Sequence, residues 1–375
     1  MGQKAPSDGR RHQGRAGRRR STYAALETRN TYVMTKPDEQ SDTIQGAKTA
    51  NIQLALSYPI ISAFEFEFLK AEEVIRERLD HSTIYLLAQR PLTYFDNVVL
   101  QDGAITFEIA DGQHRPLACR VDLVDADICA PGEALYVEVA YFIDTPPQPQ
   151  PYRQVASIKL FRTDGEFIVW WSPQKILFEM LVRGLPVGVA DDGEPLSFTD
   201  FTVLYIGKAF NQKVWDRLTG HEKMQKILTV QSPVGAGPAA RAPFEISLIL
   251  LKVVGLQEVL EVPYIGASAV QGVTPILHDL DLNDDEALER FMTEPLVPLH
   301  DEAMTREAEA CLIHRFQPRF NTVKFKSYPH IEGGMRSKGY TWTDLLIEDL
   351  PGTLRTSHFE AGPVGEIAFS SDLAE

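Results

Sequence analysis

Residues 202–221 read Thr-Val-Leu-Tyr-Ile-Gly-Lys-Ala-Phe-Asn-Gln-Lys-Val-Trp-Asp-Arg-Leu-Thr-Gly-His. The apolar run at the start predicts a strand that ends near Gly207, and the residues after it predict a helix. Lys213, Arg217 and His221 are spaced by four residues, so they lie on one face of that helix. Like charges so placed destabilise a helix unless an anion compensates them. The stripe therefore indicates either a phosphate site or a solvated basic edge.

A second segment, residues 307–321, reads Glu-Ala-Glu-Ala-Cys-Leu-Ile-His-Arg-Phe-Gln-Pro-Arg-Phe-Asn, and Lys-Ser-Tyr-Pro follows it at 326–329. Its first part predicts a helix and its Gln-Pro-Arg-Phe end predicts a turn. Glu309 lies on the helix and Asn321 follows the turn. A carboxylate suits a hard divalent cation, and a guanidinium such as that of Arg217 suits a phosphate. Taken alone, Glu309 is better explained as a solvated helix charge.

Together, the two segments resemble the GIY-YIG nuclease superfamily in the order of their motifs and in the internal spacing of the second. The second segment is most similar to the N-terminal nuclease domain of the bacterial excision-repair incision subunit. The resemblance covers residues 198–331. It implies a small mixed sheet flanked by helices that hydrolyses phosphodiester bonds with one divalent metal ion, Mg²⁺ or Mn²⁺.

The resemblance also implies a role for each matching residue. Glu309 would hold the metal and Arg217 would neutralise the scissile phosphate. Tyr205 would lie beside the nucleophilic water, Asn321 would fix the closing turn and the metal shell, and His221 would assist the general base. Contacts to nucleic acid are expected from four further basic residues: Lys208, Lys213, Arg319 and Lys326.

The sequence departs from the family pattern before the Tyr-Ile-Gly strand. The family's first strand carries Gly-Ile-Tyr, but no tyrosine occurs between Tyr152 and Tyr205. Gly184-Leu185-Pro186 or Gly188-Val189-Ala190 is therefore expected to form that strand, without the phenol that accepts a proton from water in the family. An insertion is also expected near residues 255–298, because Glu309 follows the basic helix at a long interval.

Short alternations of apolar and polar residues predict a β-rich domain before the nuclease-like one. They lie at residues 63–68, 104–109, 135–141 and 158–161. Asp111-Gly112 and Asp164-Gly165 predict hairpin turns, and Ser172-Pro173 predicts the start of a connecting helix that ends at Gly184. The expected fold class is α+β, with a β-rich barrel or sandwich followed by a GIY-YIG-like domain.

The expected organisation divides the chain into five parts. They are a disordered basic tail over 1–45, the β-rich domain over 46–171, a connector over 172–190, the nuclease-like domain over 191–345 and a C-terminal tail over 346–375.

Composition limits the classes of protein that the chain can form. It has 375 residues, 44% apolar and 24% charged, as in globular proteins. The net charge is −15, although the first 20 residues carry seven basic side chains and one acidic one. This acidic body excludes a broad nucleic-acid-coating surface. The basic tail is either a phosphate-binding arm or a solvated extension.

No apolar run approaches the ~18 residues of a bilayer span, so no membrane association is expected. The three cysteines lack metal-ligand spacing and predict a reducing, cytoplasmic location.

Three functions follow as expectations. The first is a metal-dependent endonuclease acting on nucleic acid, with DNA as the expected substrate and a possible protein partner for the β-rich domain. The second is a catalytically weak or inactive module of the same fold that binds nucleic acid or a protein. The third is a structural or assembly role for both domains.

Overall fold

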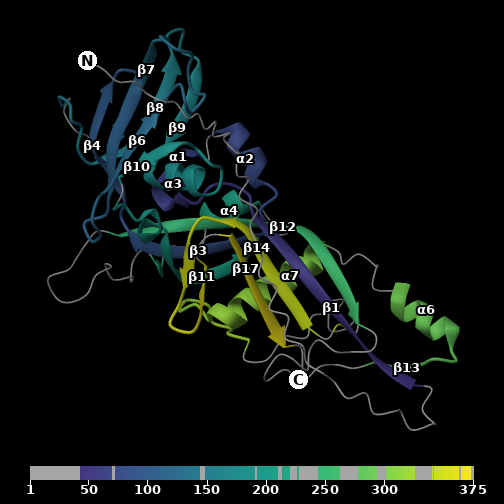
Figure 1. Ribbon diagram of the computed structural model, residues 1–375. Helices are drawn as coiled ribbons and strands as arrows, with labels where there is room; N and C mark the ends of the chain where they lie inside the picture. The colour runs from purple at the N-terminus through teal and green to yellow at the C-terminus, as the bar shows by residue number, and fades with distance from the viewer. Residues whose placement is uncertain are drawn as a thin grey trace, which may run out of the picture. The chain divides into compact units, whose positions relative to one another are not determined.

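The computed structural model describes residues 43–69, 72–143, 148–190, 192–209, 213–219, 226–227, 244–261, 278–293, 301–325, 340, 342–362 and 365–372. These residues belong to one compact unit, Asp42–Glu375. The fold is mixed α+β, with mostly strands, few helices and a curled sheet (Figure 1). None of the helices described is long and apolar enough to cross a membrane.

The larger sheet has ten strands, which come from widely separated parts of the chain. They are β1 (Thr43–Leu56), β2 (Ile61–Ser62), β3 (Ile84–Pro91), β11 (Asp200–Lys208), β12 (Phe244–Glu261), β13 (His278–Asp281), β14 (Trp342–Leu350), β15 (Thr353–Arg355), β16 (Glu360–Ala361) and β17 (Gly365–Asp372). Their order is β16-β15-β11-β3-β12-β1-β14-β17, with β13 paired to β1 and β2 paired to β12. The centre of the sheet therefore joins β3 to β11 and to β12, both antiparallel.

The smaller sheet has seven strands, all from the segment between β3 and β11. They are β4 (Tyr94–Gln101), β5 (Ala104–Ala110), β6 (Leu117–Asp122), β7 (Leu135–Tyr141), β8 (Val155–Arg162), β9 (Phe167–Trp171) and β10 (Val187–Val189). The strands predicted at 104–109, 135–141 and 158–161 are confirmed as β5, β7 and part of β8. The tight turn predicted at Asp164-Gly165 is confirmed between β8 and β9, with Gly165 at a φ of 92°, whereas Asp111-Gly112 lies in a longer loop that joins β5 to β6.

The described helices are α1 (Ala63–Leu69), α2 (Glu73–Leu79), α3 (Pro173–Leu181), α4 (Val214–Thr219), α6 (Asp285–Thr293) and α7 (Asp301–Phe316), with a 3-10 helix η1 (Pro195–Phe198). The predicted start of α3 is confirmed, since the Ser172 hydroxyl accepts a hydrogen bond from the Lys175 amide at 3.3 Å. Gly184 follows the helix at a φ of 73°, a conformation that favours glycine.

The strand predicted at residues 63–68 is wrong, because this segment forms α1. Ser62 and Glu65 form a capping box: the Ser62 hydroxyl accepts from the Glu65 amide at 3.1 Å, and the Glu65 carboxylate accepts from the Ser62 amide at 2.5 Å. These two bonds satisfy amides that the first helical turn leaves unpaired. The alternation of phenylalanine and glutamate is thus overridden by a local helix-start signal.

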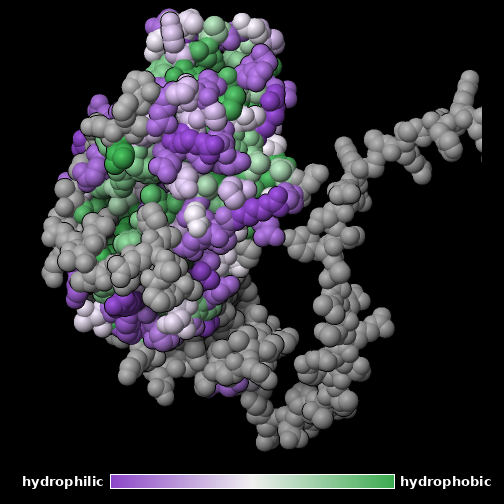
Figure 2. Space-filling model, turned by 90° about the vertical axis from the view of Figure 1, so that its left-hand side faces the viewer, coloured by the Kyte–Doolittle hydropathy of each residue, from purple (hydrophilic) through white to green (hydrophobic). Residues whose placement is uncertain are grey.

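Helices cover the larger sheet on both faces. Core residues of α7, among them Leu312 and Phe316, pack on the face that includes Leu86 of β3. Phe66 of α1 and Trp215 of α4 pack on the face that includes Leu87. Successive residues of a strand point to opposite faces, so β3 is buried on both. On the surface drawn in Figure 2, hydrophilic areas alternate with apolar ones.

Sheet pairing differs from the expected division of the chain. The expected β-rich domain began at residue 46, but β1 and β3 pair with strands of the second half. The smaller sheet instead runs from Tyr94 to Val189 and includes β10 of the expected connector. The physical reason is that β3, apolar on both faces, needs helices on both sides, as in the larger sheet.

The expected tails also differ from the structure. Residues 43–45 begin β1, while 1–42 lie outside the described residues. The expected C-terminal tail contains β15, β16 and β17, which are strands of the larger sheet. The expected insertion near 255–298 contains the end of β12 together with β13 and α6.

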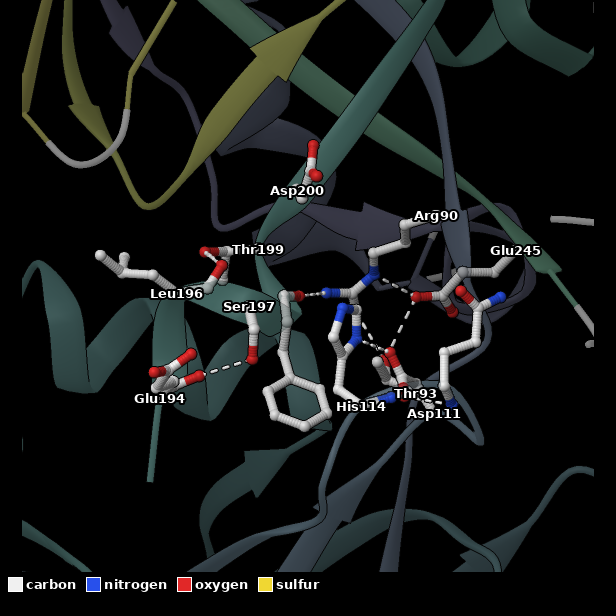
Figure 3. A network of polar contacts seen from close by, with 12 residues as sticks. Arg90, Thr93, Asp111, His114, Glu194, Leu196, Ser197, Thr199, Asp200 and Glu245 are labelled. Atoms are coloured by element: carbon white, nitrogen blue, oxygen red, sulfur yellow. Dashed lines mark hydrogen bonds and ion pairs between the residues drawn. The ribbon is translucent and has the colours of Figure 1, made fainter. Parts of the chain in front are cut away.

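A buried polar network lies where the smaller sheet leaves the larger one (Figure 3). Arg90, at the end of β3, pairs with Glu245 at 2.5 Å. It also donates to the Phe198 carbonyl and to the Thr93 hydroxyl, each at 2.6 Å. Gln174 of α3 donates to Glu245 at 3.1 Å. The connecting helix is therefore hydrogen-bonded directly to the larger sheet.

Candidate active site

The pairing of β3 with β11 brings two tyrosines together. Gly207 of β11 stands opposite Tyr85 of β3. The rings of Tyr85 and Tyr205 lie 6.1 Å apart, centroid to centroid. The strand next to Tyr-Ile-Gly thus carries a phenol, from a position more than one hundred residues earlier in the chain.

This pairing corrects the expectation for the preceding strand. Gly188 lies in β10, which pairs with β6 of the smaller sheet, and Gly184 follows α3. Tyr85 was not among the candidates from the sequence because the preceding strand was expected between Tyr152 and Tyr205. The available signal was the apolar run Ile84–Ala88, which is typical of a strand buried on both faces.

The glycine of Tyr-Ile-Gly is required by the packing of both phenols. A Cβ atom added to Gly207 would lie 2.6 Å from the Tyr85 hydroxyl and 2.8 Å from a ring carbon of Tyr205. Both distances are well below van der Waals contact. Any larger residue at 207 would therefore displace Tyr85 or Tyr205.

Arg217 reaches the tyrosines from α4. Val214, Trp215 and Leu218 of this helix are buried, which leaves the Arg217 side chain on the exposed side. Its guanidinium lowers the pKa of the Tyr85 phenol, and the Tyr85 and Tyr205 phenols also influence each other's pKa. The three side chains therefore lie close together.

The two phenols are held in their neutral forms. Burial is the largest cause that raises the pKa of Tyr85, and the neighbouring Tyr205 raises it further, while Arg217 lowers it. Burial also raises the pKa of Tyr205, and the Glu309 carboxylate adds to the increase. At neutral pH both tyrosines are therefore hydroxyl groups that donate and accept hydrogen bonds.

Glu309 approaches from α7, on which Ala308 and Cys311 anchor the helix in the core. Its carboxylate forms an ion pair with Lys208 at the end of β11, with Nζ and Oε2 2.5 Å apart. Its influence on the pKa of Tyr205 shows that the carboxylate also lies close to that phenol.

Asn321 fastens the segment after α7 to β11. Its side-chain oxygen accepts from the Ile206 amide at 2.9 Å, and its side-chain nitrogen donates to the Ile206 carbonyl at 2.8 Å. The Phe320 amide donates to the Leu204 carbonyl at 3.0 Å. These bonds hold the Pro-Arg-Phe turn beside the Tyr-Ile-Gly strand.

The remaining predicted residues are placed in different ways. Lys213 forms an ion pair with Asp80 at 2.6 Å. Arg319 is exposed, with its guanidinium over the Phe320 ring at 5.3 Å. His221 and Lys326 lie outside the described residues. The structure thus brings together Tyr205, Arg217, Glu309, Asn321 and Lys208, and adds Tyr85.

The donor set at Glu309 fits a hard divalent cation. In the part of the chain that the structure describes, no three His, Cys, Asp or Glu side chains form a group able to hold a metal ion. A metal here would have Glu309 as its protein ligand and water for the rest. Mg²⁺ commonly binds in this way, through one or two carboxylates. The Lys208 ammonium already provides positive charge at that carboxylate.

Two cavities lie elsewhere. One, of about 450 Å³, is lined by Arg120 and other residues of the smaller sheet. The other, of about 110 Å³, lies at the junction beside Arg90. The cationic side chains of Lys208 and Arg217 are instead exposed at the surface, an arrangement that suits a polymer better than a small molecule. No family model, curated protein or solved structure matches the chain.

Proposed function

We propose that the chain is a metal-dependent endonuclease of the GIY-YIG type, interrupted between its first two strands by the smaller sheet. The observation that carries this proposal is the meeting of Tyr85, Tyr205, Arg217 and Glu309, which come from β3, β11, α4 and α7. This arrangement is consistent with the resemblance of residues 198–331, and in this proposal Tyr85 takes the place of the family's first tyrosine.

The side chains divide the work of phosphodiester hydrolysis. The Arg217 guanidinium binds a phosphate and balances the charge that develops on it. The hydroxyl group of Tyr205 orients a water molecule beside that phosphate, and the buried Tyr85 phenol holds Tyr205 in place. Glu309 holds a Mg²⁺ or Mn²⁺ ion, which when bound stabilises the leaving oxygen. Asn321 keeps β11 and the closing turn in register.

The proposed substrate is nucleic acid, with DNA as the preferred form. Positive charge is local in an acidic chain, so binding depends on Lys208, Arg217 and Arg319 rather than on the whole surface. A protein partner is proposed for the smaller sheet.

A second candidate function is binding without cleavage. The observation that favours it is the complete burial of Tyr85, whose raised pKa keeps the phenol protonated at neutral pH, so that little phenolate is present to accept a proton. His221 is the other candidate base proposed for the reaction.

Cleavage assays separate the two functions. Plasmid, branched DNA and RNA are incubated with the purified protein and Mg²⁺ or Mn²⁺. Glu309→Gln and Arg217→Ala should each lower the cleavage rate by about 10²-fold or more. Lys159→Ala is the control, since this residue forms an exposed pair with Glu138 on the smaller sheet. Binding without cleavage by the wild type supports the second function, and loss of both leaves a structural role.

A further inference from the structure

The Lys208–Glu309 pair affects metal binding at Glu309, an inference that rests on the proposed function. Lys208 is the last residue of β11 and Glu309 is in the middle of α7. The Lys208 side chain is 41% exposed and that of Glu309 is 15% exposed. The ammonium can leave for solvent, whereas the carboxylate is held by its helix.

The ammonium competes with a metal ion for the Glu309 carboxylate. A Mg²⁺ ion needs to approach a carboxylate oxygen to about 2.0–2.1 Å, and the Lys208 nitrogen is 2.5 Å from Oε2. A metal ion on either oxygen of the carboxylate would be repelled by the neighbouring ammonium, since the partly buried site screens charge poorly. Metal binding is therefore stronger when Lys208 moves away.

A phosphate provides an alternative partner for Lys208. Arg217 and Glu309 both influence the pKa of Tyr205, and Lys208 is paired with Glu309. Arg217 and Lys208 therefore lie near the same phenol. A backbone phosphate beside Arg217 would attract the flexible lysine and free the carboxylate.

We infer that Lys208 makes metal binding at Glu309 dependent on nucleic acid. Without nucleic acid the ammonium holds the carboxylate and weakens metal binding. With a phosphate in the site, Lys208 binds the phosphate and Glu309 binds the metal. By linkage, metal and nucleic acid then increase each other's affinity by the same factor.

The test is a Mn²⁺ titration followed by electron paramagnetic resonance, which needs no catalytic turnover. Wild type, Lys208→Met and Glu309→Gln are titrated alone and with a phosphorothioate DNA duplex that resists cleavage. Lys208→Met should bind Mn²⁺ about 10-fold more tightly than wild type when no DNA is present, because a repelling charge is gone. The duplex should tighten Mn²⁺ binding to wild type and leave Lys208→Met unchanged.

Lys159→Met is the matched control. Lys159 forms a pair with Glu138 at 3.3 Å on the smaller sheet and is also exposed, so its loss changes the net charge equally. Its Mn²⁺ affinity without DNA should equal that of wild type. An increase equal to that of Lys208→Met would overturn the inference in favour of a general charge effect.

The outcomes distinguish this inference from the proposed function. If Glu309→Gln abolishes Mn²⁺ binding but Lys208→Met binds as wild type does, the inference is wrong and the metal site stands. If Glu309→Gln and Lys208→Met both bind as wild type does, Glu309 is not a metal ligand, and the inference and the proposed metal site fail together. Circular dichroism melts establish that each variant is folded.

Discussion

The strands β3 and β11 end in two ion pairs of similar chemistry and opposite surroundings. Arg90 and Glu245, at the junction with the smaller sheet, have side chains 1% and 8% exposed. Lys208 and Glu309, at the candidate active site, are 41% and 15% exposed. The charged atoms are 2.5 Å apart in both pairs. The two pairs therefore differ in burial and not in distance. The buried pair stabilises the fold, whereas the exposed pair can exchange partners.

The two pairs differ in how fully their donors are used. Arg90 donates from all three guanidinium nitrogens, to Glu245, the Phe198 carbonyl and Thr93. Losing one partner there leaves a buried charge without compensation. Among the residues that the structure describes, Lys208 pairs with one carboxylate, that of Glu309, and water can replace this partner at an exposed site at little cost.

The largest expected effect comes from Arg90→Met. This change leaves Glu245 and the nearby Glu65 buried without a counter-ion. We expect the free energy of unfolding to fall by about 3–5 kcal/mol, measured by urea denaturation. A loss below about 1 kcal/mol would mean that the network is not needed for the fold.

The next effect is a pH dependence of stability that originates in the same network. Burial raises the pKa of Glu245 to about 7 from its ordinary value of 4.5, despite the opposing influence of Arg90. Between these values the folded protein keeps a proton that the unfolded chain releases, so the free energy of unfolding falls as pH rises from about 4.5 to 7, by about 3 kcal/mol at most. Urea denaturation from pH 5 to 8 measures this slope. Glu245→Gln should flatten it, and a wild-type stability that increases with pH over this range would contradict the assignment.

Gly207→Ala should have an intermediate effect. Its Cβ would lie 2.6 Å from the Tyr85 hydroxyl, so Tyr85 or the strand must shift, at a cost of about 1–3 kcal/mol. Thermal denaturation measures the loss. Gly188→Ala, in a strand of the smaller sheet, is the matched control because its Cβ would meet nothing closer than 3.6 Å. Equal losses in the two variants would show that the crowding at Tyr85 is relieved without strain.

The smallest effect on stability is expected for Lys208→Met. The pair is partly exposed, so its loss should change the free energy of unfolding by about 0–1 kcal/mol. Chemical denaturation of Lys208→Met and Arg90→Met at pH 7 compares the free energies of unfolding of the two variants. A loss as large as that of Arg90→Met would place Lys208 among the residues that hold the fold.

Local patterns in the sequence predicted the structural features that depend on neighbouring residues alone. The N-cap of α3 at Ser172, the positive φ of Gly184 after that helix and the bounds of β7 follow from side-chain hydrogen bonds, backbone freedom and periodicity over a few residues. The capping box of Ser62 and Glu65 is a local signal of the same kind and indicates the start of α1. The alternation of apolar and polar residues at 63–68 instead led to the prediction of a strand. The spacing of the two motifs also selected Tyr205, Arg217, Glu309 and Asn321. The structure places Arg217 and Glu309 near Tyr205, and Asn321 is hydrogen-bonded to the neighbouring Ile206.

Tertiary structure alone decided which strands pair. Tyr85 could not be assigned to the site from its surroundings in the sequence, because the whole smaller sheet separates it from Tyr205. The apolar residues of β3 require burial on both faces but do not specify a partner strand. That partner is selected by contacts between distant segments, such as Tyr85 over Gly207 and Arg90 against Glu245. These contacts exist only once the chain has folded, so periodicity and motif spacing could not predict them.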